Sequence, residues 1–186
     1  MDLRVEKVSR SKRKNEIKNI YTSSFDKKDR MPFFMMIAMS FLWNTEFFAF
    51  YDGDTLCGFI YMATIHRMSF VMFFAVDKKL RSKGYGSSIL KIIQMMYPKN
   101  KIIITIEPCD ADVEDVELRI RRKNFYMRNG YKETGYFIKL GKKQKIIIKN
   151  GRFKRLQFSI FLLVYSCFAI IPRIRKKELN ISKMRT

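Results

Sequence analysis

Short runs of aromatic and branched apolar residues, bounded by turn residues, recur along the first part of the chain, and each predicts a strand. The runs lie at residues 3–8, 46–51, 56–64, 68–76 and 101–106. Asp52-Gly53-Asp54 separates the second run from the third and is typical of a β-hairpin. The sequence therefore predicts a meander of consecutive strands.

Between these runs the apolar residues are three or four positions apart, which predicts helices. We expect one helix from Ser11, as its N-terminal cap, to Phe25. A second has Pro32 in its first turn and apolar residues from 33 to 43, is too short to span a bilayer, and is expected to cover the sheet. A third is predicted over 84–96. Its apolar face consists of Ile89, Ile92, Ile93 and Met96.

The helix over 84–96 connects the strand at 68–76 to the strand at 101–106, so these two strands are expected to be parallel. A last helix ends at Gly130, and two strands at 131–140 and 145–149 form a final hairpin. The order of elements predicts a mixed α/β (α+β) fold.

Acidic residues gather before the last helix, at Asp110, Asp112, Glu114, Asp115 and Glu117. Negative charge is favourable in the first turn of a helix. The same carboxylates could attract a cationic amine, and the sequence leaves both interpretations open.

The stretch from 70 to 86 carries the clearest chemical signal. A buried strand is followed by a short charged loop and by Gly84 and Gly86, which open a helical pattern. Glycine lets the backbone approach a ligand closely, and free amides at a helix start bind anions. Arg81 and Lys83 add positive charge and Ser87 adds a hydroxyl. A pyrophosphate group fits such a turn.

Arg81-Ser-Lys-Gly-Tyr-Gly86 also resembles the acyl-CoA signature of the GNAT superfamily of N-acetyltransferases. A dinucleotide fold is disfavoured, because its G-x-G-x-x-G fingerprint would need glycine where this chain has Ile89. A second motif follows some forty residues later. Lys123 to Tyr131 resembles the superfamily's helix end, with Tyr126 four residues before Gly130.

The resemblance covers roughly residues 1–149 and implies a mostly antiparallel mixed sheet of about six or seven strands. The sheet would splay between its fourth and fifth strands, with helices on both faces and acetyl-CoA in the gap as the acyl donor, without a metal. Backbone groups of Phe74, Ala75 and Val76 would pair with the pantetheine arm. The pyrophosphate would be held by Arg81, Ser82, Lys83, Gly84, Tyr85, Gly86 and Ser87.

The resemblance also suggests catalytic roles. Tyr126 matches the position of the general acid, although a packing role at the helix end is the alternative. Glu107 ends the fifth strand and is the candidate base, with burial expected to raise its pKa; a structural contact is the alternative. Asn124 is a weaker candidate for cofactor contact. Where many members carry asparagine this chain has Arg119, which could reach a phosphate instead.

The chain has 186 residues and a formal net charge of +21. Nucleic acid, a membrane or an anionic ligand could each use such a charge, but compositional bias explains it equally well, and nucleic acid is not the expected partner. Cys57, Cys109 and Cys167 form neither a metal pattern nor a disulfide framework, and their odd number with no secretory leader favours a reducing, cytoplasmic location. His66 is the single histidine.

The tail from 151 to 186 follows an expected acetyltransferase domain at 1–150. Residues 156–171 are mostly apolar and basic residues flank them, up to 177. A helix packed on the domain or a partner, a membrane-associated helix and a poorly ordered tail are all compatible with this pattern.

Two classes of function follow. The first is an N-acetyltransferase that acts on a primary amine of a small molecule or peptide, as a monomer or homodimer. The second is a non-catalytic acyl-CoA-binding or regulatory module that contacts nucleic acid or membrane through its basic surface.

Overall fold

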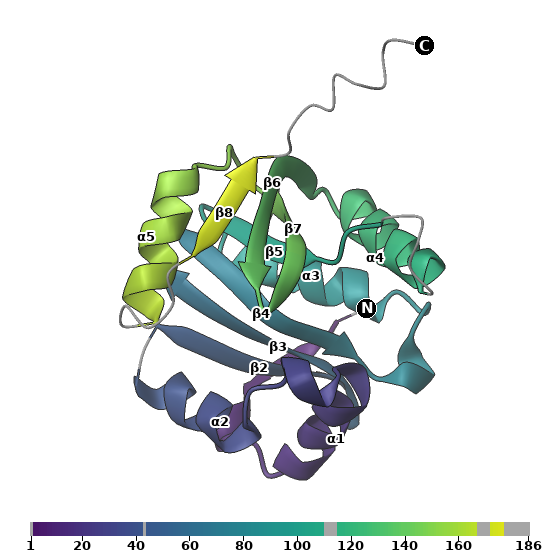
Figure 1. The fold of residues 1–186 in the computed structure, drawn as a ribbon. Helices are drawn as coiled ribbons and strands as arrows, with labels where there is room; N and C mark the ends of the chain where they lie inside the picture. Colours follow the sequence, from purple (N-terminus) through teal and green to yellow (C-terminus); the bar gives the residue numbers. More distant parts are fainter. Residues whose placement is uncertain (1, 43, 110–114, 167–171, 177–186) are drawn as a thin grey trace. The chain divides into compact units, whose positions relative to one another are not determined.

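The computed structural model describes residues 2–42, 44–109, 115–166 and 172–176. The chain divides into two compact units, Met1–Ile104 and Thr105–Thr186. Each unit combines helices and strands, which confirms the mixed α/β class (Figure 1). The predicted domain boundary at residue 150 stays a prediction.

The first unit contains four strands and most of a fifth, which are neighbours in one sheet in the order β1-β2-β3-β4-β5. The first four are antiparallel neighbours, and β4 and β5 are parallel, as the connecting helix predicted. The strands are β1 (Arg4–Lys7), β2 (Thr45–Asp52), β3 (Thr55–Ile65), β4 (Met68–Val76) and β5 (Lys101–Ile106).

The pairing between β4 and β5 is short. It runs from Met68 opposite Lys101 to Val71 opposite Ile104 and includes no later pair. At the same place, Met72 is an extra residue of β4 in its ladder with β3, which is a β-bulge. Beyond this bulge, residues 73–76 of β4 still pair with β3, and no described pair joins them to β5. This arrangement fits the predicted splay between the fourth and fifth strands.

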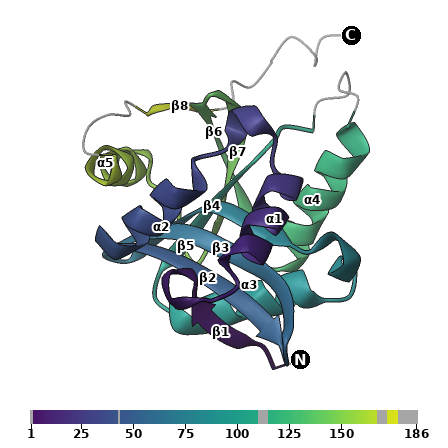
Figure 2. The ribbon, with the colours of Figure 1, turned by 90° about the horizontal axis from the view of Figure 1, so that it is seen from below.

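Helices cover both faces of this part of the sheet. Helices α1 (Lys14–Ser24) and α2 (Phe33–Leu42) lie over one face, and α3 (Tyr85–Met96) lies on the other (Figure 2). Side chains of successive strand residues point to opposite faces, so strands that are buried on both sides are apolar at nearly every position. This explains why β2 to β4 read as continuous apolar runs.

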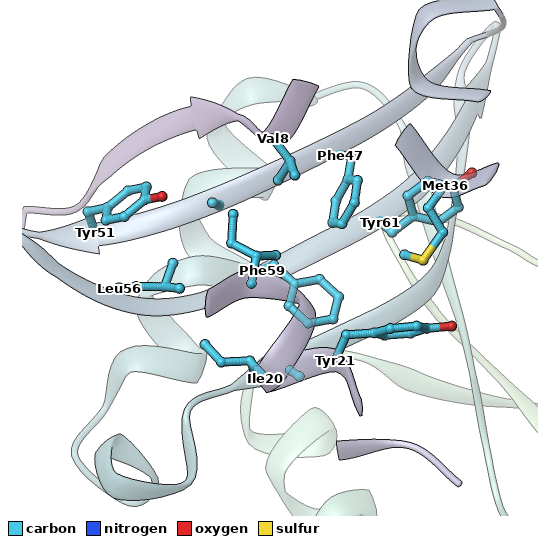
Figure 3. Packing of buried hydrophobic residues seen from close by; sticks show 12 residues of the cluster. Val8, Ile20, Tyr21, Met36, Phe47, Tyr51, Leu56, Phe59 and Tyr61 are labelled. Carbon is cyan, nitrogen blue, oxygen red and sulfur yellow. The ribbon is translucent and has the colours of Figure 1, made fainter. Parts of the chain in front are cut away.

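An aromatic cluster fixes α1 and α2 on the sheet (Figure 3). The Tyr21 ring meets that of Phe59 edge to face at 6.0 Å, and Phe47 meets Phe59 at 5.8 Å and Tyr61 at 5.3 Å. The Tyr21 hydroxyl accepts from the Met31 amide at 2.8 Å, so its buried oxygen has a partner. Such pairs add to the burial of the rings themselves.

Ser11 was predicted to cap α1, and this prediction is wrong. The helix begins at Lys14 and its capping position is Arg13. The Ser11 hydroxyl instead accepts from the Arg13 amide at 3.1 Å and forms a hydrogen bond with the Tyr51 hydroxyl at 3.2 Å, inside the core. The Ser11 side chain is therefore bound to Tyr51 of β2, forty residues later in the chain, and does not cap the helix.

The second unit contains α4 (Val116–Arg128), β6 (Lys132–Leu140), β7 (Lys142–Lys149), α5 (Arg155–Tyr165) and β8 (Arg173–Lys176). Helix α4 ends at Arg128 and its C-terminal capping residue is Asn129. Gly130 follows with a φ of +83°, so the helix stops at the predicted place. Strands β6 and β7 form the predicted hairpin. Of the acidic run, Asp110, Asp112 and Glu114 lie outside the described residues, and Asp115 precedes α4.

The tail contains a helix, as two of its three interpretations proposed, and it adds a strand that the sequence did not predict. Strand β8 pairs antiparallel with β6, from Arg173 opposite Lys139 to Lys176 opposite Tyr136. The chain thus has more strands than the six or seven expected. No helix in the described parts of the chain is long and apolar enough to cross a membrane.

Candidate active site

The conformation of the loop after β4 is set by a hydrogen bond of Asp77 and by two residues with positive φ. The Asp77 carboxylate accepts from the Lys79 amide at 2.8 Å and starts a single turn of 3-10 helix at Lys78–Leu80. Ser82 and Gly84 both have positive φ, at 64° and 88°. The chain therefore makes a sharp left-handed turn before it enters α3.

Gly84 is the capping residue of α3 and presents an open amide face. The first helical hydrogen bond runs from the Ser88 amide to the Gly84 carbonyl at 3.1 Å, so the amides of residues 85–87 come before it. No side chain caps this end, and its first turn carries no acidic residue. A Cβ built on Gly84 would meet nothing within 4 Å. The helix start combines free donors, a favourable dipole and open space, which suits an anion.

Two exposed cations stand at this turn. Arg81 reaches the Val76 carbonyl at 3.4 Å and the Ser24 hydroxyl at 3.5 Å, both weak contacts, and Lys83 is exposed. The Tyr85 hydroxyl donates to the Asp52 carboxylate at 2.8 Å, and this bond raises the pKa of Tyr85. The start of α3 is thereby fixed to the β2–β3 hairpin.

The strand that leads into the loop is closely packed against β3. Phe74 and Val76 are half-buried and Ala75 is buried. Gly58 of β3 stands opposite Val76, and a Cβ there would lie 2.3 Å from the Ala75 carbonyl oxygen. Cys57, next to it, is an extra residue in the ladder with β2. The glycine therefore allows a close backbone approach beside a bulge.

Tyr126 lies near the end of α4 in the second unit. Its side chain is 7% exposed, and its ring packs on those of Phe125 at 5.1 Å and Tyr131 at 5.5 Å. Burial raises the pKa of Tyr126 to about 12, and the Arg122 charge opposes this rise. The phenol is protonated throughout the neutral range, so it can act as a hydrogen-bond or proton donor.

Glu107 follows β5 and is held by two cations. Its carboxylate accepts from Lys142 Nζ of β7 at 2.5 Å and from an Arg122 guanidinium nitrogen of α4 at 3.0 Å. Burial alone would raise the pKa of Glu107, but the Lys142 hydrogen bond and the charges of Lys142, Arg122 and Arg119 outweigh it, and the net pKa is lowered. The predicted rise of this pKa is therefore wrong.

Arg119 and Asn124, on the same helix, differ in their surroundings. Arg119 donates from Nε to Asp115 at 2.8 Å and from its guanidinium to the Pro108 carbonyl at 3.3 Å. These bonds tie the start of α4 to the segment after β5. Asn124 is exposed.

Comparison with known proteins identifies the fold. Residues 43–133 match the family model of the acetyltransferase (GNAT) domain. This part of the chain is a GNAT domain. The matched region begins just before β2 and ends in β6, so it includes β4, the loop, α3, β5 and α4. No curated protein matches the chain.

Solved structures share the GNAT fold over most of the chain. A protein from Bacteroides thetaiotaomicron described as a GNAT-family acetyltransferase has a TM-score of 0.72 and 19% identity, over 91% of this chain and 99% of that one. An aminoglycoside 6'-N-acetyltransferase complexed with coenzyme A has a TM-score of 0.64 and 14% identity, over 81% and 99%. A Bacillus subtilis acetyltransferase in complex with CoA has a TM-score of 0.56 and 15% identity, over 81% and 99%.

The two sequence motifs, at 81–86 and 123–131, lie in different units of the chain. The residues predicted to bind the cofactor at 74–76 and 81–87 are consecutive parts of β4, the loop and α3. Tyr126 and Glu107 belong to the second unit, and Arg122 acts electrostatically on both. Sequence reasoning missed Arg122, although its spacing of four residues before Tyr126 on one helix was a usable signal.

Proposed function

We propose that this protein transfers an acetyl group from acetyl-CoA to a primary amine of a small molecule or peptide, by direct attack within a ternary complex. The observation that carries the proposal is the start of α3. Gly84 has a left-handed backbone there, the amides of residues 85–87 precede the first helical bond, and Arg81 and Lys83 are exposed beside them.

The chemistry of these groups fits a CoA pyrophosphate. Backbone amides and two cations would hold its negative charges, with Ser82 and Ser87 as further hydroxyl donors. The backbone of Phe74, Ala75 and Val76 would pair with the pantetheine arm as an added strand does. Solved structures of the same fold in complex with coenzyme A support this assignment.

The reaction needs no net proton. The amine nitrogen forms a bond to the thioester carbonyl carbon, the carbon–sulfur bond breaks, and the proton lost by nitrogen balances the one gained by sulfur. Tyr126 would donate a hydrogen bond to the departing sulfur. A thiol has a pKa near 8.5, so complete proton transfer from a phenol at about 12 costs roughly 5 kcal/mol. Tyr126 therefore acts best by stabilising the developing thiolate.

Glu107 is the predicted base, but its environment favours a structural role. A carboxylate whose pKa is lowered by two bound cations accepts a proton poorly. We propose that the acceptor amine binds in its neutral form or loses its proton to water. A turnover that falls by a hundredfold or more in Glu107→Gln, at unchanged stability, would restore the base role.

The first experiment measures a thermal shift with acetyl-CoA in moderate salt, with ADP and polyphosphate as charge controls. At about a hundred times its dissociation constant, a ligand stabilises by roughly 2.7 kcal/mol, which moves the midpoint by several degrees. We expect a shift specific to acetyl-CoA that Gly84→Val abolishes. An equal shift with polyphosphate would mean that only bare charge is being bound.

The second experiment measures thiol release with a panel of amines. Tyr126→Phe should keep the acetyl-CoA shift and lower turnover by about a hundredfold to a thousandfold, the usual effect of removing one hydrogen-bond donor to a developing negative charge. Tyr131→Phe is the matched control, because it removes a second buried phenol hydroxyl from the same aromatic pair. Unchanged turnover in Tyr126→Phe would eliminate its catalytic role. Cofactor binding without transfer to any amine would favour the non-catalytic module.

A further inference from the structure

Helix α5 is apolar on two opposite faces. Phe158, Phe161 and Leu162 are buried, and the Phe158 ring packs on that of Phe153 at 5.6 Å. On the other side, Leu156, Ile160 and Val164 are 72%, 51% and 47% exposed. These three residues are four positions apart, so they form one continuous stripe, which we call the outer ridge. The first face of α5 is therefore buried, and the outer ridge is exposed.

The outer ridge begins next to a concentration of positive charge. Arg152, Lys154 and Arg155 precede or open α5, and all three are exposed. Lys154 is the capping residue and makes no side-chain cap, and the first turn contains no acidic residue. The positive end of the helix dipole disfavours cations at this position, so the arrangement calls for an external anion.

Strand β8 supplies further cations. Arg173, Arg175 and Lys176 are exposed, while Ile174 between them is buried. The strand lies beside α5 in both views (Figures 1 and 2). Across the described residues 152–166 and 172–176 there are cations and no carboxylate side chain. The described residues of this segment therefore combine exposed apolar side chains with positive charge alone.

We propose that the outer ridge and these cations dock the protein on an anionic lipid surface. The helix has 11 residues and is about 16 Å long, so it would lie along the membrane with the ridge at the boundary of headgroups and acyl chains. The cations would contact the anionic headgroups. This inference is independent of the acyl transfer proposed above.

Two other partners fit the surface less well. Nucleic acid would satisfy the cations, but its phosphate backbone offers no counterpart to three adjacent apolar side chains. A second copy of the chain would cover the ridge, but it would bring the same cations face to face, and like charges oppose such contact. An anionic membrane satisfies both features at once.

The test measures binding of the full chain to vesicles by co-sedimentation. Phosphatidylcholine vesicles with about 30% phosphatidylserine provide the anionic surface, and pure phosphatidylcholine provides the neutral one. We expect binding to the anionic vesicles that weakens as salt is added. Replacing the ridge by Leu156→Ser, Ile160→Ser and Val164→Ser together should weaken it by tenfold or more. The single variants Lys154→Gln and Arg155→Gln should each weaken vesicle binding by about fivefold.

Matched controls separate the proposed surface from general stickiness. Met95→Ser removes an apolar side chain as exposed as those of the ridge, and Lys91→Gln removes one exposed cation. Both should bind like the wild type. Circular dichroism and the acetyl-CoA thermal shift verify that the ridge variant is folded, and they report on the cofactor site separately from the lipid surface.

Three results would overturn the proposal. The first is the absence of binding to anionic vesicles. The second is equal binding by the ridge variant, which would mean that charge alone is responsible. The third is a concentration-dependent dimer in sedimentation velocity that the ridge variant abolishes, since the ridge would then be covered by a second copy.

Discussion

The backbone of Gly58 leaves no room for a side chain beside Ala75, and Gly58→Ala tests this close approach directly. The new Cβ would lie 2.3 Å from the Ala75 carbonyl oxygen, and contacts of real Cβ atoms begin near 3.0 Å. The strands must therefore separate locally by about 0.7 Å. A ladder hydrogen bond stretched by that much exceeds 3.5 Å and is effectively lost.

The cost follows from these changes. Overpacking against a rigid backbone costs about 1–3 kcal/mol, and each lost ladder bond about 0.5–1.5 kcal/mol. The free energy of unfolding should fall by about 2–4 kcal/mol in total. In a protein of this size that lowers the midpoint of thermal unfolding by about 5–15 °C.

Thermal unfolding followed by circular dichroism measures this fall. Gly53→Ala is the control, because its φ is +54° but its Cβ would meet nothing, so only the left-handed backbone contributes, at about 1–2 kcal/mol. Since Ala75 and Val76 are proposed to pair with the pantetheine arm, Gly58→Ala should also reduce the acetyl-CoA thermal shift, whereas Gly53→Ala should keep it. A Gly58→Ala midpoint within about 2 °C of the wild type would refute the reasoning.

Three further predictions concern charges and hydroxyls. The pKa of Glu107 is lowered in the folded protein, so its ion pairs stabilise the fold above pH 4.5, and this stabilisation is lost as the pH falls through the pKa of the folded state. Glu107→Gln should therefore lose less stability below pH 4.5 than the wild type does. An unaltered pH dependence would contradict this. Arg81→Gln should weaken acetyl-CoA binding by about tenfold in calorimetry and reduce its salt dependence; an unchanged affinity would remove Arg81 from the phosphate site. Tyr85→Phe breaks the bond to Asp52 and should lower the free energy of unfolding by less than about 1 kcal/mol in urea titration, because the bond is exposed.

Most of the first unit could be predicted from the sequence because its signals are local. The Asp52-Gly53-Asp54 turn, the apolar run at 68–76 and the glycines before α3 each determine a structure within a few residues. The predicted bounds of β4 and β5 agree with those observed. Residues 81–87 could be selected as candidate pyrophosphate-binding residues for the same reason, because the strand, the turn and the helix are adjacent in the chain.

The features that sequence reasoning missed depend on distant partners. The pKa direction of Glu107 is set by Lys142, thirty-five residues later, and no local pattern shows that contact. Ser11 looks like a helix cap until Tyr51 is known to lie next to it. Strand β8 has only four residues, of which three are cations, so its intrinsic strand propensity is weak. It is a strand because it pairs with β6.

Strand β8 also has a consequence for how copies of the protein behave in solution. It occupies the side of β6 at residues 136–139 that would otherwise present unpaired amides and carbonyls to other chains. The strand in turn exposes Arg173, Arg175 and Lys176, and charged side chains at a sheet edge oppose pairing with a neighbour. A chain shortened after Lys149 would lose this protection. It should aggregate on standing, and amide hydrogens of β6 should exchange with solvent faster than in the full chain.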